Sequence, residues 1–124
     1  MNPAQRGAII VSWTGVRTGR EGKGLGVFGQ AMQRNEELEK EGRVSGTRVY
    51  LNTTGSQAGQ VILDGVYTEL QRLLLDDDFA KSLRDAAIVC DGFQVNLCVG
   101  GAPDSLTELM GSYAQTLTEH GLLG

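Results

Sequence analysis

The feature that most constrains this chain is the repeated switch of its apolar residues between the two-residue period of strands and the longer period of helices. The stretches that read as strands are residues 8–14, 47–53, 60–64 and 88–99. The segments with helical spacing are residues 21–41, 66–87 and a stretch that follows Pro103. Strands and helices that alternate in this way predict an α+β domain in which helices cover a sheet.

The order of these elements predicts a ferredoxin-like βαββαβ fold. It has a four-stranded antiparallel sheet with both crossover helices on one face, and a C-terminal helix is added. Residues 55–59 (GSQAG) are expected to form a hairpin loop. A chain of 124 residues is long enough to build one core, so residues 1–124 are expected to form a single domain.

The expected sheet has one apolar face and one mixed face. Ile9, Val11 and Trp13 share the apolar side of the first strand, so Trp13 is assigned to the core. An antiparallel sheet with helices on one side leaves its mixed face wet or covered by another chain. The polar residues of that face that could contact a ligand are Arg48, Tyr50, Asn52, Asp64, Gln94 and Asn96.

Three sequence features resemble the dimeric α/β-barrel families. These are the element order, the IIVSW strand followed by a GRE-containing turn into a long helix, and the segment LLLDDDFAKSLRDAAIV before the last strand. The resemblance covers nearly the whole chain. It implies a homodimer of ferredoxin-like subunits whose open sheet faces enclose a shared interior. Those families include antibiotic-biosynthesis monooxygenases, haem-degrading enzymes and small proteins without known activity, so the resemblance implies no single function.

The glycine-rich stretch of residues 15–29 contains the string G-x-G-x-x-G at Gly24–Gly29. In a dinucleotide site this string follows its strand directly, whereas here at least eight residues intervene and the second strand ends without an acidic residue. A P-loop is also excluded, because Gly24 stands where that motif needs Ser or Thr. The later glycines are expected to lie in a helix and to permit close packing on the sheet.

Three cations, Arg17, Arg20 and Lys23, lie at the expected entrance to the first helix. Free backbone amides at a helix start favour negative charge, so these residues are candidates for contact with an anion. The alternative is that they are solvated loop cations.

Metal and cofactor chemistry have little support in the sequence. His120 is the only histidine and follows the last helix, which disfavours haem and removes the Ser-His-Asp and Cys-His arrangements. The acidic run 76–78 is expected to cap a helix, because adjacent aspartates on a helix point in different directions. Cys90 and Cys98 are too far apart to bridge along one strand and are expected to be packing residues. We expect no metal and no cofactor.

The charge distribution limits the partners. The net charge is −4, with +3 in residues 1–62 and −7 in residues 63–124. No basic stripe matches a nucleic-acid backbone, and no apolar run is long enough for a membrane span. The opening MNPAQRG lacks the apolar core of a secretory signal, and two unpaired cysteines suit a reducing compartment. A cytoplasmic protein is therefore expected.

Two functions remain open from the sequence. The first is a homodimeric binding or structural module that uses the open sheet face without catalysis. The alternative is a cofactor-independent monooxygenase-like enzyme for a small aromatic or acyl substrate, with Arg48, Tyr50, Asn52 and Asn96 around its cavity. The first is preferred, because Asp64 is the only carboxylate on the mixed face and lies at a strand end, so no general base is evident.

Overall fold

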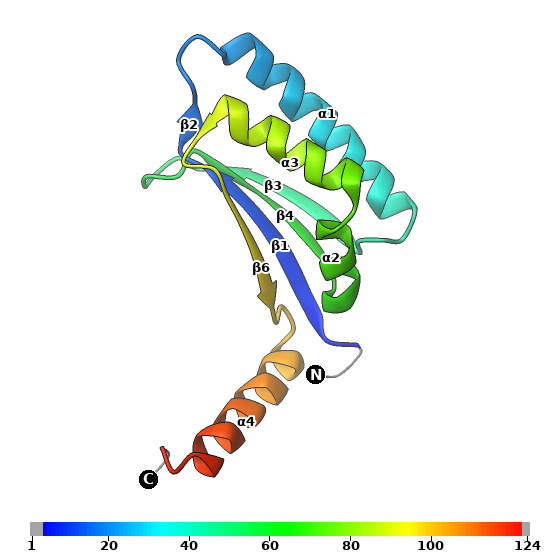
Figure 1. Cartoon of the computed structure of the whole chain (residues 1–124), viewed down its shortest axis with the longest axis vertical. Helices are drawn as coiled ribbons and strands as arrows, with labels where there is room; N and C mark the ends of the chain where they lie inside the picture. Colours follow the sequence, from blue (N-terminus) through cyan, green and yellow to red (C-terminus); the bar gives the residue numbers. More distant parts are fainter. Residues whose placement is uncertain (1–3, 123–124) are drawn as a thin grey trace.

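The computed structural model of the chain describes residues 4–122 and shows an α+β domain built on a four-stranded antiparallel sheet (Figure 1). The strand order is β3-β4-β1-β6, so β1 and β4 are central and β3 and β6 form the two edges. The bounds of the strands are Arg6–Trp13 for β1, Gly46–Leu51 for β3, Gly59–Val66 for β4 and Gln94–Val99 for β6.

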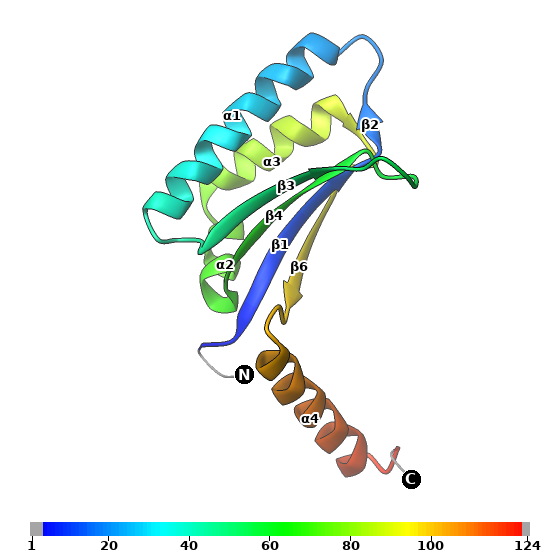
Figure 2. The same ribbon diagram turned by 180° about the vertical axis from the view of Figure 1, so that it is seen from behind.

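Four helices accompany the sheet, and three of them lie on one of its faces. Figures 1 and 2 show α1, α2 and α3 on the same side, the opposite face uncovered, and α4 extending away from the end of β6. The bounds are Glu21–Lys40 for α1, Tyr67–Leu74 for α2, Asp77–Val89 for α3 and Pro103–Glu119 for α4. Within residues 4–122, none of these helices combines the length and apolar composition that crossing a bilayer requires.

The core lies between the central strands and the three covering helices. Side chains of alternate residues on β1 and β4 point to this layer, as the sequence pattern predicts for the apolar face. The helices supply leucines from α1 and α2 and a phenylalanine from α3. The buried residues that form this core are Ile9, Val11, Leu38, Val44, Val61, Leu63, Leu70, Leu73 and Phe79.

The last expected strand is divided, so its prediction over residues 88–99 is wrong at its start. Ile88 and Val89 complete α3, and the next two residues form β5 (Cys90–Asp91), which pairs with β2 (Gly15–Val16) in a separate two-stranded sheet. Gly92 then turns the chain at φ +60°, where a Cβ would lie 2.6 Å from the Thr14 side chain. Side-chain alternation could not reveal β2 and β5, because a strand of two residues has no period.

The break between α2 and α3 is formed by the first residue of the acidic run. The side chain of Asp76 accepts a hydrogen bond from the backbone N–H of Phe79 (3.1 Å) and pairs with Arg43 (3.3 Å). The expected capping role is confirmed, because this carboxylate satisfies an amide that the helix leaves without a partner. The Phe79 N–H bond and, to a smaller extent, Arg43 lower the pKa of Asp76 below its ordinary value of 3.8.

Replacing Asp76 by alanine is therefore expected to lower the Tm by several degrees at pH 7, and the loss should shrink in acid. A carboxylate whose pKa is lowered by folding stabilises the protein above its unfolded pKa, and this contribution is lost as the pH falls through the folded value. Thermal unfolding of the wild type, Asp76→Ala and Asp76→Asn at pH 7 and pH 3 measures the effect. Asparagine also caps helices, so most of the Tm should survive in Asp76→Asn. An undiminished loss at pH 3 would contradict the role given to the ionised group.

The glycines of α1 do not act as the sequence suggested. A Cβ at Gly24 would lie 2.9 Å from Cγ1 of Val16, so this position needs a glycine where β2 passes the helix. At Gly26 and Gly29 a Cβ would meet no atom within 4 Å. The expectation of close packing on the sheet is thus wrong for these two residues, since both face away from it.

Candidate functional site

An apolar cavity of about 420 Å³ lies on the helix-covered side of the sheet, at the end next to β2 and β5. The first half of α1 forms one wall, and the central strands and the end of α3 form the others. Trp13 and Phe28 meet there edge to face, with ring centroids 6.1 Å apart and planes at 65°. The lining residues are Val11, Trp13, Val16, Glu21, Gly24, Leu25, Val27, Phe28, Ala31, Met32, Leu51, Val61, Ala86, Val89, Cys90 and Phe93.

Two small residues of the wall help to leave the cavity open. Ala31 and Ala86 fill less of the layer between helix and sheet than larger apolar side chains would. Leu25, of which 76% is exposed, stands on the wall with its apolar surface in water. Small-molecule sites are likewise concave and mostly apolar.

The cavity holds two groups with acid–base or nucleophilic chemistry, Glu21 and Cys90. Burial, and the charge of Asp91, raise the pKa of the Cys90 thiol, against a smaller opposing effect of Arg17. At neutral pH this residue is thus a protonated thiol and a weak nucleophile. Among residues 4–122, no group of three or more His, Cys, Asp or Glu side chains is placed to hold a metal ion. This arrangement is suited to binding an apolar molecule.

Five of the six polar residues predicted on the mixed face do share that face, in rows set by the strand register, and the prediction is wrong for Asn52, which lies beyond the end of β3. One row crosses the sheet through Arg48, Ile62, Ile10 and Asn96, and the next contains Tyr50 and Gln94 at its two ends. Tyr50 and Asn96 lie in adjacent rows on opposite edges of the sheet, so three strand spacings and a two-residue offset along the strands keep them about 16 Å apart. They do not converge within one chain. The role of this set in binding a ligand stays a prediction.

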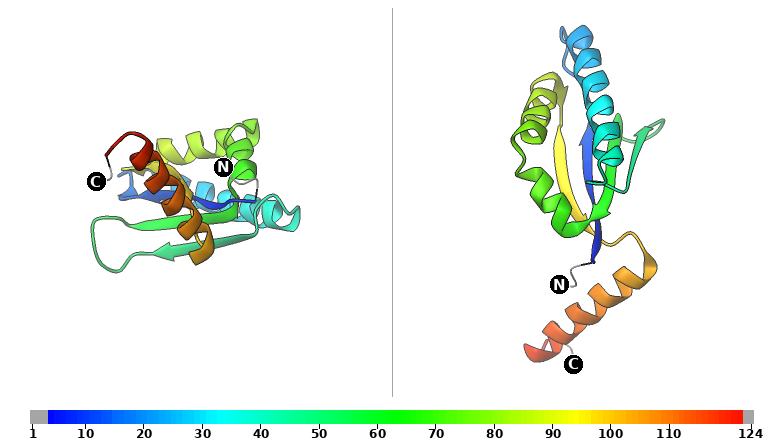
Figure 3. Two further views of the ribbon diagram at one scale, coloured as in Figure 1. Left: turned by 90° about the horizontal axis from the view of Figure 1, so that it is seen from below. Right: turned by 90° about the vertical axis from the view of Figure 1, so that its right-hand side faces the viewer.

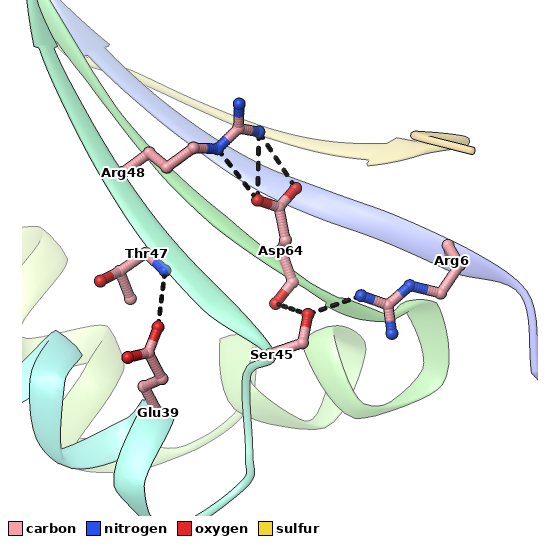
Figure 4. Close-up of polar contacts among 6 residues, drawn as sticks. All are labelled: Arg6, Glu39, Ser45, Thr47, Arg48 and Asp64. Carbon is pink, nitrogen blue, oxygen red and sulfur yellow. Dashed lines mark hydrogen bonds and ion pairs between the residues drawn. The ribbon is translucent and has the colours of Figure 1, made fainter. Parts of the chain in front are cut away.

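Arg48 and Asp64 do come together, as Figure 4 shows, on the open face near the start of β1. Nε and Nη2 of Arg48 donate to the Asp64 carboxylate at 3.2 and 3.3 Å, and the Tyr50 hydroxyl and Asp64 both raise the pKa of Arg48. Ser45 donates to the backbone carbonyl of Asp64 (3.1 Å) and accepts from Arg6 (2.5 Å). The Asp64 carboxylate, the only one predicted on the mixed face, is therefore held in a two-point ion pair.

Asn52 lies just beyond β3 in the hairpin loop, where its backbone N–H donates to the carbonyl of Ala58 (2.9 Å). Its side chain is on the exposed loop and outside the rows of the sheet. His120 follows α4 as its C-cap residue, and Cys90 and Cys98 are free thiols. None of these residues adds a reactive group to the cavity apart from Cys90.

Two of the three cations proposed to contact an anion, Arg17 and Arg20, instead bind the C-terminal end of α3. Nη1 of Arg20 donates to the Ile88 carbonyl (2.7 Å), and Nε of Arg17 donates to the Cys90 carbonyl (3.3 Å) and pairs with Asp91 (3.4 Å). The last carbonyls of a helix lack intrahelical partners and carry the negative end of its dipole, so cations suit them. Lys23 lines a separate shallow hollow with Asp85 and Ile88. Anion binding by these three residues stays a prediction. The guanidinium groups of Arg17 and Arg20 already have partners within the chain.

Sequence reasoning missed the cavity, although it placed the relevant residues correctly on one stripe. Leu25, Phe28 and Met32 recur at helical spacing within the predicted helix 21–41, and a cavity wall and a core give the same pattern. The available signal was the mixture of large apolar residues with glycine and alanine in the first half of the helix. In comparisons with protein-family models, with curated proteins and with solved structures, nothing matches the chain.

Proposed function

We propose that this protein is a homodimeric, ferredoxin-like binding module that holds a small apolar molecule in the cavity under α1. The cavity is the observation that carries the proposal. Its volume of about 420 Å³ falls in the range of small-molecule sites, and its lining is almost wholly aliphatic or aromatic. A neutral aromatic or branched aliphatic compound fits these walls, since they offer few polar groups to a charged one.

The fold assignment within this proposal is supported by the strand order and by the position of the covering helices. In βαββαβ domains the two central strands are the first and third, as β1 and β4 are here once the short β2 and β5 are set aside. The assembly is supported by the uncovered face, whose central row contains Ile10 and Ile62. Apolar side chains in the middle of an open face favour burial against a second sheet.

Trp13 provides a direct test of ligand binding, because it lines the cavity and is the only tryptophan of the chain. The probe is N-phenyl-1-naphthylamine, a neutral apolar fluorophore that absorbs tryptophan emission. We expect saturable quenching of Trp13 together with a rise in probe emission. Ala86→Leu, which adds a larger side chain to the cavity wall, should weaken the affinity at least about tenfold by occupying the space.

The matched control is Ala87→Leu, a change of the same size one residue later on α3 that does not add to the cavity lining. Its affinity for the probe should stay within about threefold of the wild type, a difference below 1 kcal/mol. Circular dichroism checks that both variants are folded. Equal weakening by the two variants, or no saturable binding by the wild type, would refute the cavity as the ligand site.

A further inference from the structure

The first half of α1, residues 21–29, forms one wall of the cavity and is weakly held by the rest of the chain. The buried residues of α1 are Gly24, Asn35 and Leu38, so its first half buries only a residue without a side chain. Leu25, which lines the cavity, is 76% exposed. The right-hand view of Figure 3 shows the first turns of α1 rising past the ends of the strands of the main sheet. Little packing therefore stabilises this half of the helix.

The same nine residues also have a low helix preference. They contain four glycines, and only proline is less favourable than glycine inside a helix. Close packing against Val16 explains the second of these glycines. A Cβ at Gly22, Gly26 or Gly29 would meet no atom within 4 Å, so packing does not require the other three. The helix also begins after Arg20 without a side-chain cap for its free amides. With neither packing nor preference to support it, this half is the least stable part of α1.

Both ends of this weak segment are fixed. Before it, Nη1 of Arg20 donates to the Ile88 carbonyl (2.7 Å), which ties the turn to the end of α3. After it, Met32 packs against the core and Leu38 belongs to the core. The second half of α1 is therefore held by burial, whereas the first half spans the cavity between two anchors. Any opening of residues 21–29 is local and does not require the whole helix to move.

We propose that residues 21–29 are the lid of the cavity: this half of α1 opens to admit the apolar ligand and closes over it again as a helix. Segments of low local stability supply such lids, because they open far more often than the rest of a fold. The inference rests on the ligand site in the proposed function and is independent of the homodimer. The lining residues that the lid carries are Glu21, Gly24, Leu25, Val27 and Phe28.

Stabilising the helix of the lid should slow ligand exchange and leave the affinity unchanged. Gly26→Ala and Gly29→Ala add methyl groups outside the cavity lining, and each favours the helix over the open state about two- to fivefold. Stopped-flow mixing with N-phenyl-1-naphthylamine, followed by Trp13 emission, gives both rate constants. In the double variant the association and dissociation rate constants should both fall about five- to 30-fold. Kd should stay within about twofold, because the closed helix is the same with and without the probe.

The matched control is Gly111→Ala in α4, the same change at another helical glycine whose Cβ would meet no atom within 4 Å. Both of its rate constants should stay within about twofold of the wild type, since α4 does not line the cavity. A double variant that resists urea better but exchanges the probe at the wild-type rates would overturn the lid, because the probe then enters without opening of the helix. A less stable double variant would show that this side of α1 packs on another surface, which would overturn it too.

Amide hydrogen exchange of the free full-length chain tests the opening without any ligand. The amides of residues 25–29 should exchange at least about tenfold faster than those of residues 33–38 in the same helix, and saturating probe should slow the first group selectively. Equal protection of the two halves would overturn the lid, as would fast exchange of residues 25–29 that bound probe does not slow. Absence of saturable probe binding would instead refute the ligand site of the proposed function, and the exchange of the free chain would still show whether residues 21–29 open.

Discussion

Replacing Leu70 by alanine is expected to lower the free energy of unfolding by about 2–5 kcal/mol. Leu70 is fully buried in α2, and its Cδ2 would lie 3.2 Å from a Cβ at Gly65 on β4, so the side chain sits directly against the backbone of the sheet. The backbone of β4 is held by strand pairing on both sides and cannot move inward to fill the space. The deletion should therefore leave most of its cavity open, which puts the cost in the upper part of this range.

The control for Leu70 is Leu75→Ala, just after the end of α2, where the side chain is 83% exposed. Its effect should stay within about 0.5 kcal/mol. Urea unfolding at one fixed protein concentration measures both variants, since stability depends on concentration if the protein associates. Losses of similar size in the two variants would show that α2 does not pack on the sheet as described.

Replacing Gly7 by alanine is expected to destabilise the protein by about 1–3 kcal/mol or to prevent folding, because the new methyl group meets backbone. Gly7 lies on β1, paired with Gly65 on one side and Val99 on the other. A Cβ here would lie 2.4 Å from the carbonyl oxygen of Cys98, which belongs to the neighbouring strand. Relief requires β1 and β6 to separate, and the hydrogen bonds between them would weaken.

The matched change for Gly7 is Gly26→Ala, in the exposed part of α1, which should act in the opposite direction. A Cβ at Gly26 meets no atom within 4 Å, and alanine is favoured over glycine inside a helix by about 0.5–1 kcal/mol. Thermal and urea unfolding of both variants should thus give shifts of opposite sign. A destabilised Gly26→Ala variant would show that this face of α1 is in contact with another surface, and a neutral Gly7→Ala variant would contradict the close approach of β1 and β6.

Gly26 is also the middle glycine of the G-x-G-x-x-G string at Gly24–Gly29. In a dinucleotide site the middle glycine of G-x-G-x-x-G lets the backbone approach the pyrophosphate. Here Gly24–Gly29 lies inside α1, and Gly24 approaches the Val16 side chain. The structure thus confirms the expectation that this string lies within a helix. Gly24 is needed for packing against Val16, whereas Gly26 and Gly29 make no close contact and only lower the helix preference of α1.

Most helices and strands of the sheet were predictable because each has enough residues to show its period. The strands β1, β3 and β4 and the helices α1 to α4 all follow from alternation, from stripes or from end signals such as Asp76 and Pro103. The pairing of β2 with β5 was not predictable, because it joins residues more than 70 positions apart through backbone bonds such as Thr14 N–H to the Asp91 carbonyl. Backbone groups carry no sequence signal of their partner.

The candidate site was also predictable only in part, for the same reason. The sequence correctly put Arg48 and Asp64 on one face, since alternation assigns every residue of a strand to one side. It could not show that Arg17 and Arg20 bind the end of α3, because that depends on how closely the turn after β1 passes the helix. It also could not distinguish the cavity from core, because the distance between α1 and the sheet is set by all the side chains between them.

The sequence by itself determined which residues face which side of the longer elements, roughly where those elements lie, and the opposite charges of the two halves of the chain. These are local properties, fixed by the backbone period and by side-chain type. Only the tertiary structure decided that the hollow lies under α1 while the polar residues spread over the open face. It alone showed that Gly100 and Gly101 carry α4 clear of the domain. Such features depend on distances between elements far apart in the chain, and local sequence patterns do not specify those distances.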